Sequence, residues 1–210
     1  MKKPILPLLF TFCLLVLGIL GAAVPANETG YKVGDTARDF KLKNVDGKMV
    51  SMASYKDAKG FIVTFTCNTC PYSVAYEDRI IALHKKYAPK GYPVIAINPN
   101  DVGVSPKDSY THMQQRAKEK NFPFVYLQDP TQEITKAYGA TRTPHLYVVQ
   151  KQSDGKYKVA YIGAIDDNSR EPDEVQKKYA EAALNELVAN KPVSQPNTKA
   201  IGCTIKWREV

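Results

Sequence analysis

Cysteine is scarce in this sequence, and internal repeats, long flexible linkers and nucleic-acid-binding motifs are missing from it. Four cysteines in 210 residues are too few for a small protein held together by disulfides, so any cysteine pair needs another explanation. No long stretch rich in proline, serine or glycine divides the chain into linked domains. The length suits one domain with a full core, and 44% hydrophobic with 24% charged residues is typical of a globular protein.

The longest hydrophobic run lies at the N-terminus. Two lysines precede an apolar stretch from Ile5 to Val24, and the small residue Ala26 follows shortly after. This three-part arrangement is typical of a secretory signal peptide at 1–26, with cleavage predicted after Ala26. An uncleaved membrane anchor is the alternative, because about 20 apolar residues can just span a bilayer. We therefore expect a periplasmic or secreted protein, attached to a membrane only if this segment is retained.

The positive charge of the chain is modest and dispersed. Removal of residues 1–26 takes away two lysines and no acidic residue, which lowers the formal net charge from +8 to +6. The lysines alternate with acidic residues rather than forming a basic stripe, as in Lys118-Glu119-Lys120. We therefore expect a mildly basic, solvated surface and no nucleic-acid partner.

Strand and helix signals alternate along the rest of the chain. Short apolar runs bounded by turn residues predict buried strands, and apolar residues at helical spacing predict helices between them. An Asp-Gly pair at 46–47 predicts a hairpin before the first long strand. The strands are expected at 61–65, 94–97, 124–127, 145–149 and 157–162, and the helices at 71–88, 108–120, 131–138 and 174–189.

This order of elements predicts an α/β domain whose central mixed sheet is flanked by helices. We expect the domain to cover residues 27–190. Residues 191–210 contain two prolines and then the apolar segment 201–207, and we expect them to form a C-terminal tail that packs on the domain.

The strongest chemical signal is Cys67-Asn68-Thr69-Cys70-Pro71, placed where the strand at 61–65 gives way to a helix. Two cysteines three positions apart at such a junction can close a small disulfide ring. A helix N-terminus lowers the pKa of a thiol, because it presents unpaired N–H groups and the positive end of the helix dipole. Proline is favoured at the first helical position, which makes Cys70 the N-cap and Cys67 its expected disulfide partner.

A static disulfide and a metal site are the alternatives for this pair. A small ring gives little entropic stabilisation, so a purely structural disulfide is the weaker explanation. Zinc needs two further ligands, and only Cys203 and three histidines are left in the mature chain. We therefore predict redox chemistry at Cys67 and Cys70, with no resident cofactor and no metal.

Together with other segments, this motif resembles the thioredoxin-like redoxins over nearly all of the mature chain. The segment 33–47 is similar to the opening hairpin of periplasmic thiol oxidoreductases and peroxiredoxins, and Thr143-Pro144 resembles the cis-proline loop of thioredoxins. The Cys-Asn-x-Cys-Pro-Tyr motif at 67–72 and the Gly-Cys-x-Ile-Lys-Trp tail at 202–207 resemble one branch, similar to alkyl hydroperoxide reductase and thiol-specific antioxidant proteins. The resemblance implies a thioredoxin-like fold with an N-terminal β-hairpin.

The resemblance also implies roles for the cysteines. Counted from Phe65, the thioredoxin pattern places the nucleophile at Cys70. Ser73 then stands where a glutaredoxin has its second cysteine, so the resolving thiol is expected at Cys67. A looser alignment makes Cys67 the nucleophile, and both assignments stay open. Cys203 is left over, either as a resolving thiol, as a buried free thiol or as a partner in an external disulfide.

Thr143, Pro144 and Tyr72 are the expected substrate-binding residues. A cis X–Pro bond turns the preceding backbone toward the active-site sulfur, where an extended substrate peptide could pair as a short added strand. Tyr72 is two residues from Cys70 and would form the rim of the same groove.

These observations predict an exported thiol–disulfide oxidoreductase that acts on protein or small-thiol substrates with an unknown redox partner. In this mechanism Cys70 attacks a substrate disulfide and Cys67 then displaces the product. A thiol peroxidase of the peroxiredoxin type is the alternative. This sequence lacks the threonine that peroxiredoxins have three residues before the peroxidatic cysteine, because Cys67 stands there. It also has Pro144 where those enzymes have an arginine, although Arg142 lies nearby. The third interpretation is a copper-binding assembly chaperone with Cys67, Cys70 and His145 as ligands.

Overall fold

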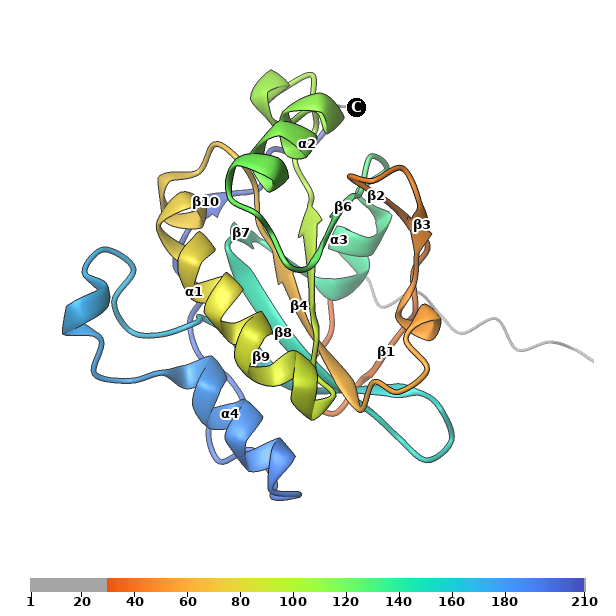
Figure 1. Ribbon diagram of the computed structural model, residues 1–210, viewed down its shortest axis with the longest axis vertical. Coiled ribbons are helices and arrows are strands. Elements are labelled where there is room, and N and C mark those ends of the chain that lie inside the picture. Colours follow the sequence, from red (N-terminus) through yellow and green to blue (C-terminus); the bar gives the residue numbers. More distant parts are fainter. Residues whose placement is uncertain (1–29, 210) are drawn as a thin grey trace, which may run out of the picture.

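A central mixed sheet with helices on both faces organises the domain, and the computed structural model describes it for residues 30–209 (Figure 1). Eight strands hydrogen-bond in the order β1-β9-β8-β4-β5-β6-β2-β3, and two further strands form a separate small pair. The expected signal peptide at 1–26 lies outside the described residues. Within residues 30–209, no helix is long and apolar enough to cross a membrane.

The middle of the sheet consists of the strands with the most apolar sequences. β4 (Gly60–Phe65), β5 (Val94–Asn98) and β6 (Val125–Gln128) are parallel, whereas β8 (His145–Lys151) is antiparallel to β4 and to β9 (Tyr157–Gly163). Every residue of β4 and β5 is buried, because helices or loops cover both faces of these strands. The outer strands are short and comprise β1 (Thr36–Ala37), β2 (Leu42–Asn44) and β3 (Met49–Val50), with β7 (Arg142–Thr143) and β10 (Cys203–Thr204) forming the separate pair.

The helices divide unequally between the two faces of the sheet. α1 (Pro71–Tyr87) and α4 (Tyr179–Val188) bury apolar side chains against one face, and α2 (Tyr110–Glu119) packs on the same face through Met113. α3 (Glu133–Tyr138) packs on the other face, where Phe40 and Met52 of the N-terminal segment join the same core cluster. Within the described residues 30–209, single 3₁₀ turns accompany these helices: η1 (Met52–Ser54), η2 (Ala88–Lys90), η3 (Pro106–Asp108) and η4 (Pro172–Glu174).

The expected helix at 174–189 is wrong at its start, because α4 begins only at Tyr179. The preceding residues are held in an extended path by the loop after β9. The Asp167 N–H donates to the carbonyl of Lys177, and the Asp167 carboxylate accepts from the Gln176 N–H. These tertiary contacts outweigh the helical spacing of the apolar residues.

The tail crosses the domain after α4 and returns to the start of α1 (Figure 1). It first runs beside β9, where the Ile162 N–H donates to the carbonyl of Pro196. It then supplies β10, which pairs antiparallel with β7, and it buries Ile205 in the main core cluster with 4% of the residue exposed. This path brings a residue of the tail, Cys203, beside the N-terminus of α1.

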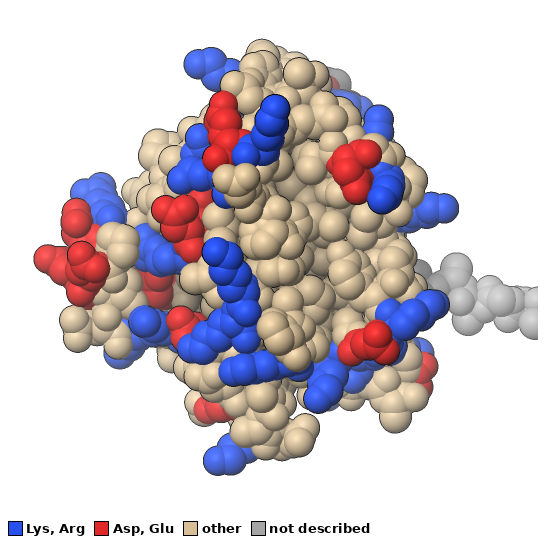
Figure 2. Space-filling view, viewed as in Figure 1, with Lys and Arg blue, Asp and Glu red and all other residues tan. Residues whose placement is uncertain are grey.

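Charged side chains of both signs share the surface of the domain. On the face shown in Figure 2, acidic side chains lie among the more numerous basic ones. Several basic residues of the domain form ion pairs, such as Lys86 with Glu181 of α4. In the interior, Arg116 binds the buried carboxylate of Glu77 through two hydrogen bonds of 2.7 and 2.6 Å, which ties α2 to α1.

Candidate active site

The site lies at the junction between β4 and α1, where the C-x-x-C motif forms the connecting loop. β4 ends at Phe65 and α1 begins at Pro71, so Cys70 occupies the N-cap position with an extended backbone. No side chain caps this helix end, and because Pro71 has no N–H, the first backbone donors of the helix are those of Tyr72 and Ser73. The helix N-terminus therefore stabilises negative charge on the Cys70 sulfur when the thiol is reduced.

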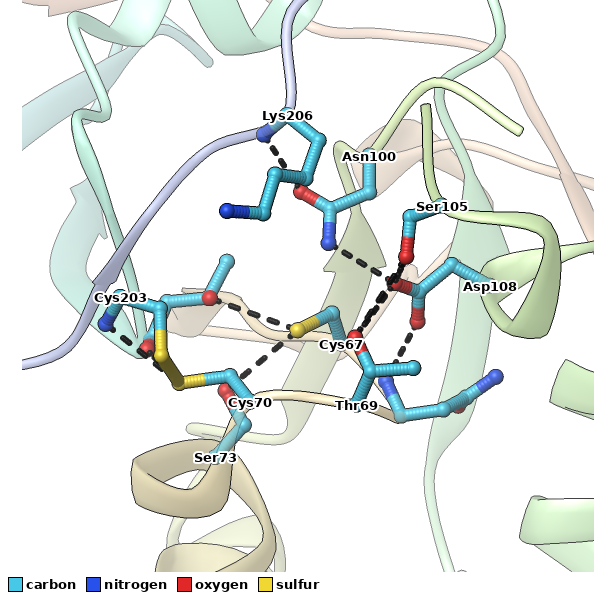
Figure 3. Close-up of a disulfide and its surroundings, with 11 residues drawn as sticks. Cys67, Thr69, Cys70, Ser73, Asn100, Ser105, Asp108, Cys203 and Lys206 are labelled. Atoms are coloured by element: carbon cyan, nitrogen blue, oxygen red, sulfur yellow. Dashed lines mark hydrogen bonds between the residues drawn. A yellow bond between two sulfur atoms is a disulfide. The ribbon is translucent and has the colours of Figure 1, made fainter. Parts of the chain in front are cut away.

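The disulfide of the structure joins Cys70 to Cys203 of the tail, with their Cα atoms 5.9 Å apart (Figure 3). The sequence predicted a disulfide between Cys67 and Cys70, but Cys67 is a free and buried thiol. β10 places Cys203 directly opposite Thr143, whose carbonyl oxygen is 3.0 Å from the Cys70 sulfur. The Cys203 N–H also donates to the Cys70 sulfur at 3.4 Å.

The sulfur of Cys67 is engaged by hydroxyl groups rather than by another sulfur. It lies 3.4 Å from Oγ1 of Thr143 and donates to Oγ of Ser73 at 3.9 Å (Figure 3). Cys67 also lines a cavity of about 10 Å³ together with Glu77 and Tyr126, which is about the space of one water molecule. Neither a peptide nor a small thiol fits there.

The three cysteines differ in how far solvent can reach them. Cys67 and Cys70 are 3% and 4% exposed, whereas Cys203 is partly exposed. Thr143 contacts both buried cysteines, because its hydroxyl lies against the Cys67 sulfur and its carbonyl against the Cys70 sulfur. Of these three cysteines, Cys203 therefore has the largest exposed fraction.

The residues expected to bind substrate surround this disulfide. The Thr143–Pro144 peptide bond is cis, and both residues are buried. The backbone of Thr143 is already paired with Cys203, so the tail occupies the position expected for an added substrate strand. Tyr72 follows Cys70 in the first turn of α1 and is partly exposed.

A buried carboxylate that the sequence analysis missed holds the cysteine loop in place. Asp108 is 1% exposed and accepts hydrogen bonds from the Asn68 N–H at 2.7 Å and from the Thr69 hydroxyl at 2.9 Å. It also accepts from the Ser105 hydroxyl at 2.7 Å. These bonds fix the backbone between the two cysteines of the motif (Figure 3).

The same carboxylate is linked to the tail through Asn100. The Asn100 side-chain amide donates to Asp108 at 2.8 Å, and its oxygen accepts from the Lys206 N–H at 2.9 Å. A continuous set of hydrogen bonds therefore connects the cysteine loop with the segment that carries Cys203. The available sequence signal was the run of polar residues after β5, because side chains at the carboxyl ends of parallel strands commonly form sites.

His145 is placed for packing rather than for ligand binding. It is buried, its Nδ1 accepts a hydrogen bond of 3.4 Å from the Thr141 N–H, and its ring packs against Tyr147. Burial lowers the pKa of His145 to about 4, so the imidazole is neutral at physiological pH. In the part of the chain that the structure describes, no three His, Cys, Asp or Glu side chains gather closely enough to hold a metal ion. The copper interpretation therefore lacks an assembled set of ligands.

With this geometry in place, comparison with known proteins identifies the family. Residues 33–158 match the model of the AhpC/TSA family. The chain belongs to the AhpC/TSA family. The thiol-disulfide oxidoreductase ResA of Geobacillus thermodenitrificans is 26% identical over 159 residues, which are 72% of this chain and 84% of that protein.

Solved structures share the fold of this chain. An uncharacterised conserved protein from Geobacillus kaustophilus is 35% identical, with a TM-score of 0.78 over 85% of this chain and 94% of the other. A thiol:disulfide interchange protein of the thioredoxin family from Chlorobium tepidum is 22% identical, with a TM-score of 0.50 over 63% of this chain and 87% of the other. The expected thioredoxin-like α/β fold is confirmed, and the protein is a redoxin, an oxidoreductase.

Proposed function

We propose that the protein is an exported thiol–disulfide oxidoreductase whose working bond is the Cys70–Cys203 disulfide. The observation that carries this proposal is the pairing of a cysteine at the N-cap of α1 with a second, partly exposed cysteine beside the cis-proline. Membership of the AhpC/TSA family and the similarity to ResA, which is named a thiol-disulfide oxidoreductase, support the reaction class.

The chemistry is a reversible exchange of thiols and disulfides. A dithiol partner opens the Cys70–Cys203 bond and leaves both cysteines as thiols, while its own two sulfurs become a disulfide. A substrate disulfide closes the bond again and is reduced in turn. Cys70 is the more reactive thiolate of the pair, because the α1 N-terminus and the Cys203 N–H both stabilise its negative charge. Cys203 takes the place of Cys67 as the second cysteine of the redox pair in this scheme.

Protein substrates suit the surface around the site better than small thiols do. In residues 30–209, seven large hydrophobic side chains are exposed. Five of them lie on the first turn of α1, on the loop after β5 or on the tail: Val74, Val102, Val104, Ile201 and Trp207. Each of these segments contributes to the site or is hydrogen-bonded to it, and exposed apolar side chains on them favour contact with another protein surface.

A redox titration of the mature chain, residues 27–210, in glutathione buffers tests the proposal. Fluorescence of Trp207, the single tryptophan, reports on the bond because it lies four residues from Cys203. We expect one two-electron couple that is retained in Cys67→Ser and lost in Cys70→Ser and Cys203→Ser. Absence of any couple in the wild-type protein would contradict the function. If the couple is lost in Cys67→Ser but retained in Cys203→Ser, the redox pair is Cys67 and Cys70, as the sequence predicted.

Export can be tested separately from the chemistry. The N-terminal segment supports a cleaved signal peptide, and we expect the protein recovered from the periplasm or medium to begin at Asn27. Intact mass measurement of the exported protein decides this point. A membrane-bound product that retains residues 1–26 would indicate an uncleaved anchor.

A thiol peroxidase remains the second candidate because of the family to which the chain belongs. A peroxide would oxidise Cys70 to a sulfenic acid, which would condense with the Cys203 thiol and give the same disulfide with release of water. Arg142 is exposed on β7, and Cys67 stands where the polarising threonine is expected. We therefore expect hydrogen peroxide consumption with dithiothreitol to be slow compared with disulfide exchange. Rapid consumption that requires Cys70 would favour the peroxidase.

A further inference from the structure

We infer that the redox partner is joined to this protein through the sulfur of Cys203, and that Cys70 acts only inside the molecule. The inference rests on the proposed function and assigns the atom at which the partner reacts. It differs from the sequence-based expectation, in which a substrate meets Cys70 directly. It depends on the segment 198–206, which we call the strap.

The strap is anchored at its first end on β9. The Thr198 N–H donates to the carbonyl of Ile162 at 3.0 Å, and the Ala164 N–H donates to Oγ1 of Thr198 at 2.9 Å. The hydroxyl of Tyr161 also contacts Oγ1 of Thr198 at 2.5 Å. None of these contacts involves the disulfide.

The second end of the strap is anchored even more firmly. Ile205 is buried in the main core cluster, and the carbonyl of Lys206 accepts from the Asp101 N–H and from the Gln132 side chain, both at 2.9 Å. The Lys206 N–H donates to Asn100, as described above. Because both ends are held independently, reduction of the disulfide does not release the strap.

Between its two anchored ends, the strap pairs with β7 and covers the edge of that strand. Cys203 pairs with Thr143, and Gly202 lies so close to this edge that an added Cβ would come within 2.2 Å of the Thr143 carbonyl oxygen. Only a residue without a side chain fits there. A second extended peptide therefore has no room beside Thr143, and Cys70, which is 4% exposed, offers an incoming partner less surface than the partly exposed Cys203.

The chemistry of the bond favours the same sulfur. When a disulfide opens, the thiol that holds its negative charge best is the better leaving group. Cys70 has this property, because it lies at the N-terminus of α1 and accepts a hydrogen bond from the Cys203 N–H. Attack on Cys203 expels the stabilised Cys70 thiolate, whereas attack on Cys70 would expel the less stabilised Cys203 thiolate.

A partner thiolate attacks Sγ of Cys203, a bond forms between these two sulfurs, and the Cys203–Cys70 bond breaks with its electron pair on Cys70. The second thiol of the partner then attacks the partner sulfur of this mixed disulfide and expels Cys203, which takes up a proton. The partner is oxidised by two electrons and this protein is reduced by two. In the reverse direction, the Cys70 thiolate attacks Cys203 and expels the bound partner.

Trapping of the mixed disulfide with glutathione tests the inference on the full mature chain. Oxidised protein is mixed with excess glutathione, quenched with acid within milliseconds to seconds, alkylated and digested, and the modified cysteines are located by mass spectrometry. The same experiment in Cys67→Ser prevents migration of the adduct to Cys67. We expect glutathione on Cys203 and the alkyl group on Cys70, with at least a tenfold excess over the opposite arrangement.

Three outcomes separate this inference from the proposed function. Glutathione on Cys203 supports both. Glutathione predominantly on Cys70 at the earliest times overturns the inference and leaves the oxidoreductase in place. If no adduct forms and the disulfide resists glutathione and dithiothreitol alike, both are overturned, because the bond is then structural.

Discussion

Cys203 and Thr143 lie directly opposite each other in the antiparallel pair of β10 and β7. The tail thus gives its own strand to the edge beside the cis-proline, where we had expected the backbone of a substrate. This pairing directs the Cys203 N–H to the Cys70 sulfur, to which it donates a hydrogen bond, and it holds the strap over the site. It makes the C-terminal segment part of the active site rather than an appendage of the domain.

Anchoring of the strap through Ile205 can be measured with a matched pair of tail variants. Ile205 is 4% exposed in the main core cluster, whereas Ile201 in the same segment is 44% exposed. We expect Ile205→Ala to lower the free energy of unfolding by about 2–4 kcal/mol, since it leaves a cavity in the core. Ile201→Ala should change it by less than about 0.5 kcal/mol. Urea unfolding of both variants checks this, and equal effects would contradict the anchoring.

The carboxylate of Asp108 should be needed for the order of the cysteine loop. Asp108→Asn keeps the shape of the side chain but turns one acceptor into a donor that faces groups which themselves donate, such as the Asn68 N–H and the Thr69 hydroxyl. We expect a loss of about 2–4 kcal/mol in the free energy of unfolding, because buried donors lose their partner. We also expect a shifted midpoint for the Cys70–Cys203 couple.

Asp57→Asn is the control for Asp108→Asn, because Asp57 is an exposed aspartate that precedes β4, whereas the cysteine loop follows the other end of that strand. Urea unfolding and the glutathione titration are measured for both variants. If Asp108→Asn lowers stability but leaves the midpoint where it is in the wild type, the carboxylate supports the fold and does not position the loop.

Much of the site could be predicted from the sequence because its signals are local. Cys70 as an N-cap follows from the apolar strand before it and the proline after it, and the sheet follows from short apolar runs at strand spacing. The partner of Cys70 could not be predicted in this way. Cys203 is 133 residues away, and its position depends on tail contacts made largely by backbone groups, which leave no mark on residue type.

The role of Asp108 could not be predicted from local sequence either. A single aspartate before a helix is usually a cap or a solvated residue, and nothing in its neighbours reveals that it is buried. Only the fold brings together the cysteine loop, the residues after β5 and the tail around this one carboxylate. Local patterns therefore predicted the place of the chemistry, whereas long-range packing determined which groups take part.

Stability should depend on pH through His145. Burial lowers its pKa from 6.5 to about 4, so between these values the unfolded chain binds a proton here that the folded protein does not. The free energy of unfolding therefore falls as the pH falls through this window, by up to roughly 3 kcal/mol at about 1.4 kcal/mol per pKa unit. Urea unfolding from pH 7 to pH 4 measures this dependence.

His145→Gln isolates that contribution, because glutamine does not titrate. Burial raises the pKa of Asp129, which opposes the trend at the acidic end, but both proteins carry this aspartate and its effect cancels in their difference. We expect the variant to lose less stability than the wild type between pH 6.5 and pH 4. If the free energy of unfolding falls equally with pH in both proteins, His145 does not cause the pH dependence.

Close packing of the strap at Gly202 should set how easily the disulfide is reduced. In Gly202→Ala the new Cβ would lie 2.2 Å from the Thr143 carbonyl oxygen, so the strap must move off β7, and such overpacking costs about 1–3 kcal/mol. We expect the disulfide to become easier to reduce by roughly tenfold, about 30 mV, and Cys70 in the reduced protein to be alkylated faster.

Gly155→Ala is the control for this strap variant. Gly155 lies in the turn between β8 and β9, where an added Cβ meets nothing within 4 Å but a φ of +82° still makes the substitution unfavourable. It therefore imposes a backbone cost far from the strap along the chain. If both variants shift the midpoint and the alkylation rate equally, the effect comes from general destabilisation. A shift confined to Gly202→Ala shows that the fit of the strap against Thr143 protects Cys70.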